Sequence, residues 1–179
     1  MKRALTIVNM DSPGSPPLPL AGFRVLDFTR FLAGPYAAMV LADLGADVIK
    51  VEPPEGRDDF RNFGPFHESG ESWSFIQANR GKRSVALDLK DPRGRALALK
   101  LAAQSDLILE SFRPGVAARL GLSYDDVKVL RPDVLYCSVS AFGQTGPYAN
   151  SKNSPRRASP TTSTRRHHSD RHRPAAADP

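Results

Sequence analysis

The feature that most constrains this sequence is a repeated alternation of short β-rich runs with helical segments between Phe23 and Gly143. The runs are rich in valine, isoleucine, leucine and phenylalanine, and glycine, proline or aspartate bounds them, as is usual for strands. Such alternation predicts an α/β domain in which helices cover both faces of a mainly parallel sheet. We expect strands, in chain order, over 23–29, 47–52, 84–90, 106–112 and 133–143.

The segments between these runs carry helix signals. We expect helices over 34–46, 91–104, 114–121 and 123–132, and no regular element over 53–81. Pro35 and Gly45 stand at the two ends of the first helix, and Asp91 is the expected N-cap of the second. Apolar residues in the first helix recur at i, i+3, i+4 and i+7, which predicts its buried face. These residues are Ala37, Val40, Leu41 and Leu44.

Composition divides the chain into three parts. A flexible, proline-rich leader is expected over 1–20, and a Rossmann-like, doubly wound domain over 21–150. After Asn150 there is no Val, Ile, Leu, Met, Phe, Trp, Tyr or Cys. Because no side chain there can offset the entropy lost on ordering, we predict that 151–179 is a disordered tail rich in Arg, Ser, Pro and His.

The charge of the chain resides mainly in that tail. The formal net charge is +6, of which the tail carries +5, so residues 1–150 are nearly neutral. Any attraction to nucleic acid is therefore expected to be non-specific and to come from the tail. The single cysteine, Cys137, is expected to be buried in a strand. The sequence has no pair of cysteines for a disulfide, no signal peptide and no apolar run long enough to span a membrane. We therefore expect a cytoplasmic protein without a membrane partner.

Loops that follow the expected strands are the places where a ligand is expected. They read TRFLAGP, EPPEGRDDFR, LKDPRG, SFRPG and SAFGQTGP. Arginine beside a helix N-terminus suits a phosphate group. The alternative is that these arginines are solvated surface residues. The arginines concerned are Arg57, Arg61, Arg113 and Arg119.

Other catalytic and cofactor signatures are missing or weak. The loop after the first strand lacks the G-x-G-x-x-G that dinucleotide binding needs, and the sequence has no Walker phosphate loop. Asp27 lies within an expected strand and Asp43 within an expected helix, so structural roles are predicted for both. No metal site is expected, because His167, His168 and His172 have no cysteine or glutamate beside them.

Four stretches together resemble a known family. They are LAGFRVLDFTRFLAGPYAAMVLADLGADVIKVEPPEGRDDFR, NRGKRSVALDLKDPRG, DLILESFRPGVAARLGL and RPDVLYCSVSAFGQTGPY, and they follow one another in order from Leu20 to Tyr148. These stretches are similar to the N-terminal part of class III (CaiB/BaiF) CoA-transferases, a family that includes formyl-CoA transferase, carnitine CoA-transferase and the related α-methylacyl-CoA racemase.

The resemblance implies a set of residues that contact coenzyme A. Arg119 matches a basic residue near the CoA phosphates, a role that suits a guanidinium group. Leu32 matches a position beside the reacting acyl group that is polar in formyl-CoA transferase, so formyl and oxalyl substrates are not expected. The complete predicted set is Leu32, Leu87, Asp88, Leu89, Lys90, Ser111, Phe112, Arg113, Arg119, Leu120, Ala141 and Phe142.

The resemblance also implies an activity. Members move CoA from an acyl-CoA thioester to a carboxylic acid through an aspartate that forms a mixed anhydride. That aspartate is not recognisable in this chain, because Asp170 lies in a polar setting unlike the family's. We therefore predict a truncated CoA-transferase that is inactive alone and does not fully form the family's interlocked homodimer. The alternatives are a racemase-like fragment and a non-catalytic α/β protein with a polyanion-binding tail.

Three origins for the tail remain open. The codons could be read in a shifted frame, because GC-rich codons read out of phase yield Arg, Pro, Ala, Ser, Thr and His. The tail could instead be a basic arm, or its histidines could bind a metal. We favour the first, since the composition and the family resemblance change at the same place, near Asn150.

Overall fold

The chain folds as an α/β domain with a parallel sheet at its centre. The computed structural model describes residues 17–54, 58–149 and 151, and the backbone of 161–165. Five parallel strands stand in the order β3-β2-β1-β4-β5. They are β1 (Arg24–Phe28), β2 (Asp47–Glu52), β3 (Arg83–Ala86), β4 (Leu107–Glu110) and β5 (Leu135–Ser140). This arrangement confirms the predicted doubly wound, mainly parallel class.

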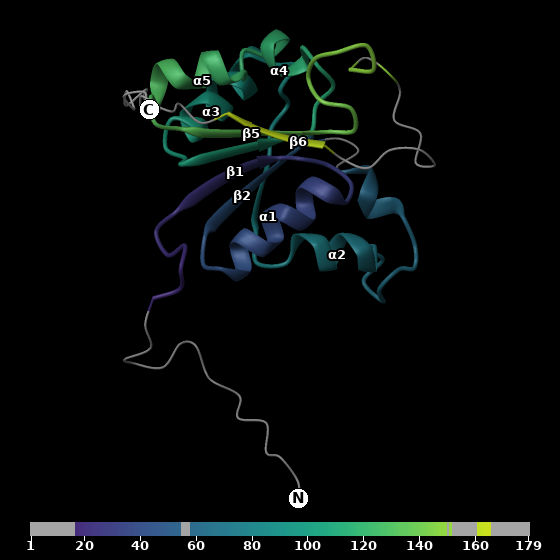
Figure 1. The fold of residues 1–179 in the computed structure, drawn as a ribbon. Coiled ribbons are helices and arrows are strands. Elements are labelled where there is room, and N and C mark those ends of the chain that lie inside the picture. Colours follow the sequence, from purple (N-terminus) through teal and green to yellow (C-terminus); the bar gives the residue numbers. More distant parts are fainter. Residues whose placement is uncertain (1–16, 55–57, 150, 152–160, 166–179) are drawn as a thin grey trace, which may run out of the picture.

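Helices cover both faces of the sheet (Figure 1). On one face lie α1 (Ala33–Asp43) and α2 (Trp73–Asn79), and the 3₁₀ helix η1 (Asp59–Asn62) precedes α2. On the other face lie α3 (Pro92–Ala102), α4 (Val116–Arg119) and α5 (Tyr124–Leu130). The predicted helices over 34–46, 91–104, 114–121 and 123–132 are therefore confirmed, with shorter bounds.

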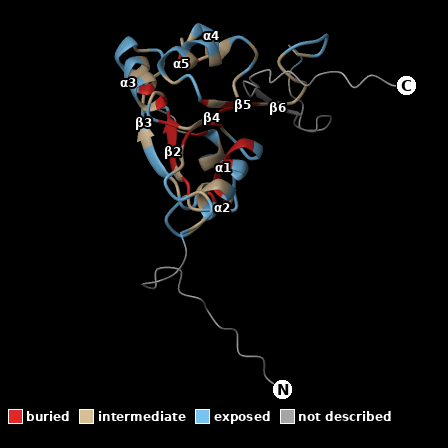
Figure 2. Ribbon diagram, turned by 60° about the vertical axis from the view of Figure 1, so that its left-hand side comes forward, coloured by how far each residue is buried: buried red, intermediate tan, exposed pale blue. Residues whose placement is uncertain are grey.

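Alternating side chains of the strands supply a core on each face of the sheet. In β1, Val25 packs toward α1 in one cluster, and Leu26 packs toward α3 and α5 in the other. Figure 2 shows the buried residues concentrated in the strands and on the inner sides of the helices. Cys137 is a buried member of the α1-side cluster, which confirms its predicted burial in a strand.

Local signals explain where two of the helices begin. Asp91 accepts a hydrogen bond from the N–H of Arg93, and Pro92 is the first residue of α3, which confirms the predicted N-cap. Ser123 and Asp126 form a reciprocal capping box at the start of α5. Such caps satisfy N–H groups that have no partner within the helix.

The predicted buried face of α1 is wrong. Ala37, Val40 and Leu44 are exposed, and Leu41 is only partly buried. The first turn of α1 lies tightly against the loop that follows β1: a Cβ on Gly34 would lie 2.4 Å from Cβ of Thr29. The buried residues of α1 are Gly34, Pro35, Ala38 and Met39.

The stretch 53–81, for which no regular element was predicted, contains η1 and α2. Both are too short for helical periodicity to be visible in the sequence. A signal for α2 is nevertheless present, because Ser72 accepts a hydrogen bond from the N–H of Phe75 as an N-cap.

The backbone of Thr161–Arg165 forms β6, antiparallel to β5 at the edge of the sheet. At these five residues the structure differs from the predicted disorder. Threonine favours extended backbone, and the edge of β5 offers unpaired backbone groups. Apart from Ser151, the other residues of 151–179 lie outside the described part of the chain, so disorder there stays a prediction. The same holds for residues 1–16 of the predicted leader.

Candidate functional site

The strand order reverses between β1 and β4, and the loops at their carboxyl ends lie side by side there. Such a reversal is the place where open α/β sheets bind ligands. The N–H of Arg30, after β1, donates to the Ser111 hydroxyl, after β4, at 3.0 Å. This hydrogen bond ties the two loops together across the reversal.

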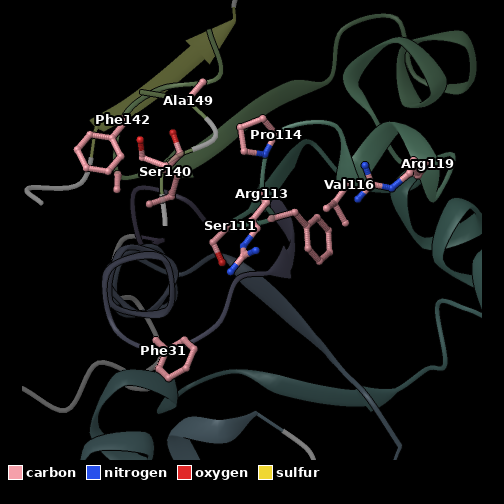
Figure 3. Close-up of a pocket in the computed structure, with 13 residues that line it drawn as sticks. Phe31, Ser111, Arg113, Pro114, Val116, Arg119, Ser140, Phe142 and Ala149 are labelled. Carbon is pink, nitrogen blue, oxygen red and sulfur yellow. The ribbon is translucent and has the colours of Figure 1, made fainter. Parts of the chain in front are cut away.

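The larger cavity at this edge has a volume of about 420 Å³. Figure 3 shows Ser140, Phe142 and Ala149 on one side of it, Val116 and Arg119 on the other, and Arg113 and Pro114 between them. Phe31, from the loop after β1, completes the lining (Figure 3). Guanidinium groups, hydroxyls and aromatic rings therefore meet in one hollow, a combination that suits an anionic ligand with an apolar portion.

A smaller cavity of about 260 Å³ adjoins it, and the side chains of Phe112 and Val116 line both. Its walls come from the ends of β1, β2 and β3 and from α4. The wall is mostly apolar, with Arg30 and Lys90 as the cationic residues. The other lining residues are Phe28, Val51, Glu52, Pro53, Leu87, Asp88, Leu89 and Leu120.

The structure gathers all but one of the residues that the family resemblance predicted. Leu87, Asp88, Leu89, Lys90, Phe112 and Leu120 line the smaller cavity. Ser111, Phe112, Arg113, Arg119, Ala141 and Phe142 line the larger one. Leu32 lines neither cavity, and its side chain is 57% exposed. Whether these residues contact CoA stays a prediction.

The sequence reasoning missed Arg30, Phe31, Val116 and Ser140, which also line the cavities. Phe31 and Ser140 are next in the chain to Leu32 and Ala141, which were predicted, so proximity in the loops was the available signal for these two. Phe31 has a further property that no sequence pattern reports. Its φ is 62°, a left-handed conformation that is rare for a residue other than glycine.

The predicted ambiguity over the loop arginines is resolved for Arg61. Its guanidinium binds both carboxylate oxygens of Glu52 at 2.9 Å, contacts Glu71 at 2.9 Å and lies over the ring of Phe75. Burial favours a higher pKa for Glu52, but hydrogen bonds from Arg61 and Ser84 outweigh it and lower that pKa. Arg61 is therefore a structural residue that joins β2, η1 and α2.

The remaining loop arginines and the two aspartates differ in their surroundings. Arg113 and Arg119 are exposed and line the larger cavity, whereas Arg57 lies outside the described residues. Asp27 is fully buried in an ion pair with Lys82, as expected for a structural role. Asp43, the last residue of α1, forms an exposed ion pair with Arg80. Both aspartates therefore have the predicted structural roles.

Glu110 holds the loop that carries Ser111, Phe112 and Arg113. It is the last residue of β4 and 3% exposed, and its carboxylate accepts a hydrogen bond from the N–H of Phe112 at 2.6 Å. Burial raises the pKa of Glu110, and hydrogen bonds from Ser138 and from the Phe112 N–H oppose that rise. The buried carboxylate thus supports the cavity wall from beneath without lining it.

This raised pKa predicts a pH dependence of stability. The ordinary pKa of 4.5 applies to the unfolded chain, so the folded chain binds the Glu110 proton more tightly. Ionisation of Glu110 therefore costs stability as the pH rises from 4.5 through the folded pKa. Urea unfolding from pH 4 to 7 should show the Glu110→Gln variant gaining stability relative to wild type as the pH rises. A difference that is independent of pH would contradict this, and exposed Glu68→Gln serves as the control.

Comparison with known proteins identifies the relatives of this fold and site. Residues 20–154 match the family described as CoA-transferase family III. The chain belongs to this family. The family resemblance of the four stretches is thereby confirmed.

Individual family III relatives are similar over most of this chain. Succinate–glutarate CoA-transferase of Agrobacterium fabrum is 51% identical over 146 residues, which are 78% of this chain and 36% of that protein. Human succinyl-CoA:glutarate CoA-transferase is 46% identical over 129 residues, 72% of this chain and 30% of that protein. The crystal structure of a CAIB/BAIF family protein from Brucella suis superposes with a TM-score of 0.70 at 44% identity, over 75% of this chain and 36% of that one.

This family III chain thus spans about a third of the length of these relatives. Within its described residues no three His, Cys, Asp or Glu side chains are grouped so that they could hold a metal ion. No helix in that same part of the chain is long and apolar enough to cross a membrane.

Proposed function

We propose that this chain forms the CoA-binding part of an enzyme that moves CoA from an acyl-CoA thioester to a carboxylic acid. The observation that carries the proposal is the convergence, at the strand reversal, of all the predicted CoA-contacting residues except Leu32. These residues come from the loops that follow β3, β4 and β5 and from the end of α4, and these segments are far apart in the sequence. Their convergence on two adjoining cavities supports a shared ligand.

The two cavities suit different parts of coenzyme A. Arg113 and Arg119 present guanidinium groups that bind phosphate oxygens well. The loop Leu87–Lys90 offers apolar side chains and backbone groups to the nucleoside end. The apolar and hydroxyl-bearing wall near Ser140 and Phe142 suits the pantetheine arm. In this proposal, the ligand passes over Phe112 and Val116, which line both cavities.

The proposed acceptors are short dicarboxylates. The Agrobacterium and human relatives are named for succinate or succinyl-CoA and glutarate, and a Chloroflexus aurantiacus relative is named for succinyl-CoA and L-malate. A second carboxylate would remain anionic during transfer and would need a cation or N–H groups near the thioester.

The described part of the site is suited to binding rather than to the covalent step. None of the described residues that line the larger cavity is Asp, Glu, His, Cys or Lys. A transferase of this family needs a carboxylate nucleophile there. We therefore expect the 179-residue chain by itself to catalyse no exchange of CoA between succinyl-CoA and glutarate. Robust exchange by the purified chain would contradict this part of the proposal.

Titration calorimetry of the full chain with CoA tests the binding proposal. Arg119→Gln should weaken CoA binding about tenfold, because a hydrogen bond to a charged group contributes roughly 1.5–3 kcal/mol and 1.4 kcal/mol is a factor of ten. The control is Arg83→Gln, which removes the same charge from a residue that pairs with Asp47 away from both cavities. Equal affinities of Arg119→Gln and wild type would argue against the assignment of Arg119 to the phosphates.

A further inference from the structure

Two fully buried ion pairs lie beneath the loop that follows β1. Lys50 Nζ is 3.0 Å from Asp58 Oδ2, and these side chains are 2% and 1% exposed. Lys82 Nζ is 2.9 Å from Asp27 Oδ2, with 2% and 0% exposed. Buried pairs of this kind are weak evidence for stability, because desolvation offsets most of their attraction. Because stability does not explain why these charges are buried, we expect another role for the two pairs.

All four side chains bind the backbone of residues 29–35. The lysines hold carbonyl groups at its two ends: Lys50 donates to Thr29 O at 2.8 Å and Lys82 to Pro35 O at 2.9 Å. The aspartates accept from N–H groups of the same stretch. Asp27 accepts from the Thr29 N–H at 2.9 Å, and Asp58 accepts from the Phe31 N–H at 3.4 Å. We call these four residues the clamp.

Phe31 is the residue that the clamp holds in an unfavourable backbone conformation. Its φ of 62° lies in the left-handed region, which is unfavourable for a residue with a side chain. In this conformation Phe31 lines the larger cavity, and its ring lies 6.5 Å from that of Phe60 and 6.1 Å from that of Phe63. Asp58 also accepts from the Phe60 N–H at 3.1 Å. One carboxylate therefore places both Phe31 and a neighbouring ring.

We propose that Asp58, kept in place by Lys50, is a positioning residue that fixes the Phe31 ring as a wall of the larger cavity. The clamp acts on the backbone, and none of its four residues lines the larger cavity, whereas Phe31 does. The inference rests on the proposed function as far as CoA is the ligand. The position of the Phe31 backbone can be tested without any ligand.

A matched pair of double variants separates charge from positioning. Lys50→Met/Asp58→Asn removes both charges but keeps an oxygen that can accept from the Phe31 N–H. Lys50→Met/Asp58→Leu removes the charges and the acceptor together. Replacing both partners leaves no unpaired buried charge, so both variants should retain the fold. Arg80→Met/Asp43→Asn, which removes an exposed pair at α1, is the control.

Amide hydrogen exchange by NMR on the ligand-free chain is the first measurement. Protection of the Phe31 amide should fall at least about tenfold in the leucine variant, relative to the amides of β1, and should stay within about threefold in the asparagine variant. Equal protection in the two variants would overturn the positioning role. This result does not depend on whether CoA binds.

CoA titration of the same proteins is the second measurement. We expect about tenfold weaker binding for the leucine variant and less than about twofold change for the asparagine variant and the control. Phe31→Ala, which leaves the clamp intact, should show the same tenfold loss, and it decides the question if the leucine variant does not fold. Wild-type affinity of Phe31→Ala would overturn the inference. No CoA binding by wild type would instead refute the proposed function, with amide exchange still deciding the positioning role.

Discussion

Replacement of Asp27 by alanine is expected to lower the free energy of unfolding by about 3–5 kcal/mol, the usual result of breaking a buried ion pair. Lys82 would remain 2% exposed with Pro35 O and the Asn79 side chain as acceptors but without a carboxylate. Burial already lowers the pKa of Lys82, and Asp27 opposes that effect. Without Asp27 the ammonium group would lose its proton or draw water into the core, and both are costly.

Urea unfolding at pH 7, followed by circular dichroism, measures this loss. Asp59→Ala is the control, because Asp59 pairs with Arg30 at 3.3 Å with its side chain 58% exposed, and such pairs contribute about 0–1 kcal/mol. The double variant Asp27→Asn/Lys82→Met should recover most of the lost stability, since it leaves no buried charge. A loss of less than about 1 kcal/mol for Asp27→Ala would contradict the burial of this ion pair away from water.

Gly94→Ala is expected to destabilise the chain by about 1–3 kcal/mol, although alanine is the better helix former by roughly 1 kcal/mol. A Cβ on Gly94 would lie 1.9 Å from the backbone oxygen of Asp88 and 2.8 Å from its carbonyl carbon. Backbone cannot yield as the end of a flexible side chain can. Either α3 or the loop Leu87–Lys90 must therefore move, and that loop lines the smaller cavity.

Thermal unfolding and CoA titration of Gly94→Ala measure the two consequences. We expect weaker CoA binding together with lower stability, because the wall of the smaller cavity shifts. Lys100→Ala, at an exposed position of the same helix, should change neither quantity by more than about 0.5 kcal/mol. A crystal structure of Gly94→Ala with an unmoved Leu87–Lys90 loop and wild-type stability would contradict the close approach.

The strands could be predicted from sequence because parallel strands covered on both faces are nearly continuous apolar runs. The residues at which the strands end could not be predicted in this way. The run at 84–90 was predicted as one strand, but β3 ends at Ala86 and Leu87–Lys90 turn toward α3. The face of α1 was predicted wrongly because the pattern rule assumes that large apolar residues are buried. In the structure the inward side of α1 consists of Gly34, Pro35, Ala38 and Met39, so Val40 and Leu44 remain exposed.

The residues of the candidate site also include some that the sequence predicted and some that it did not. Its loops could be named from motifs that resemble a family, and all the named residues except Leu32 do line the cavities. Phe31 and Arg30 lie in the predicted loop TRFLAGP, but their individual places could not be predicted, because they depend on a left-handed backbone and on the bond to Ser111. Loops are positioned by contacts with residues that are distant in the chain, and such contacts leave no periodic pattern in the sequence.

The sequence by itself determined the order of the five parallel strands and of four helices, the parallel class of the sheet, the N-cap at Asp91 and the family, since each follows from neighbouring residues or a run of motifs. Only the tertiary structure decided which charges are buried. The sequence predicts a structural role for Asp27 but does not show its partner, and it gives no sign that Lys50, Asp58 and Lys82 are buried. The side chains of all four are almost fully buried around one loop. The physical reason is that the cost of burying a charge depends on its partner, and the partners here lie 8 and 55 residues away in the chain.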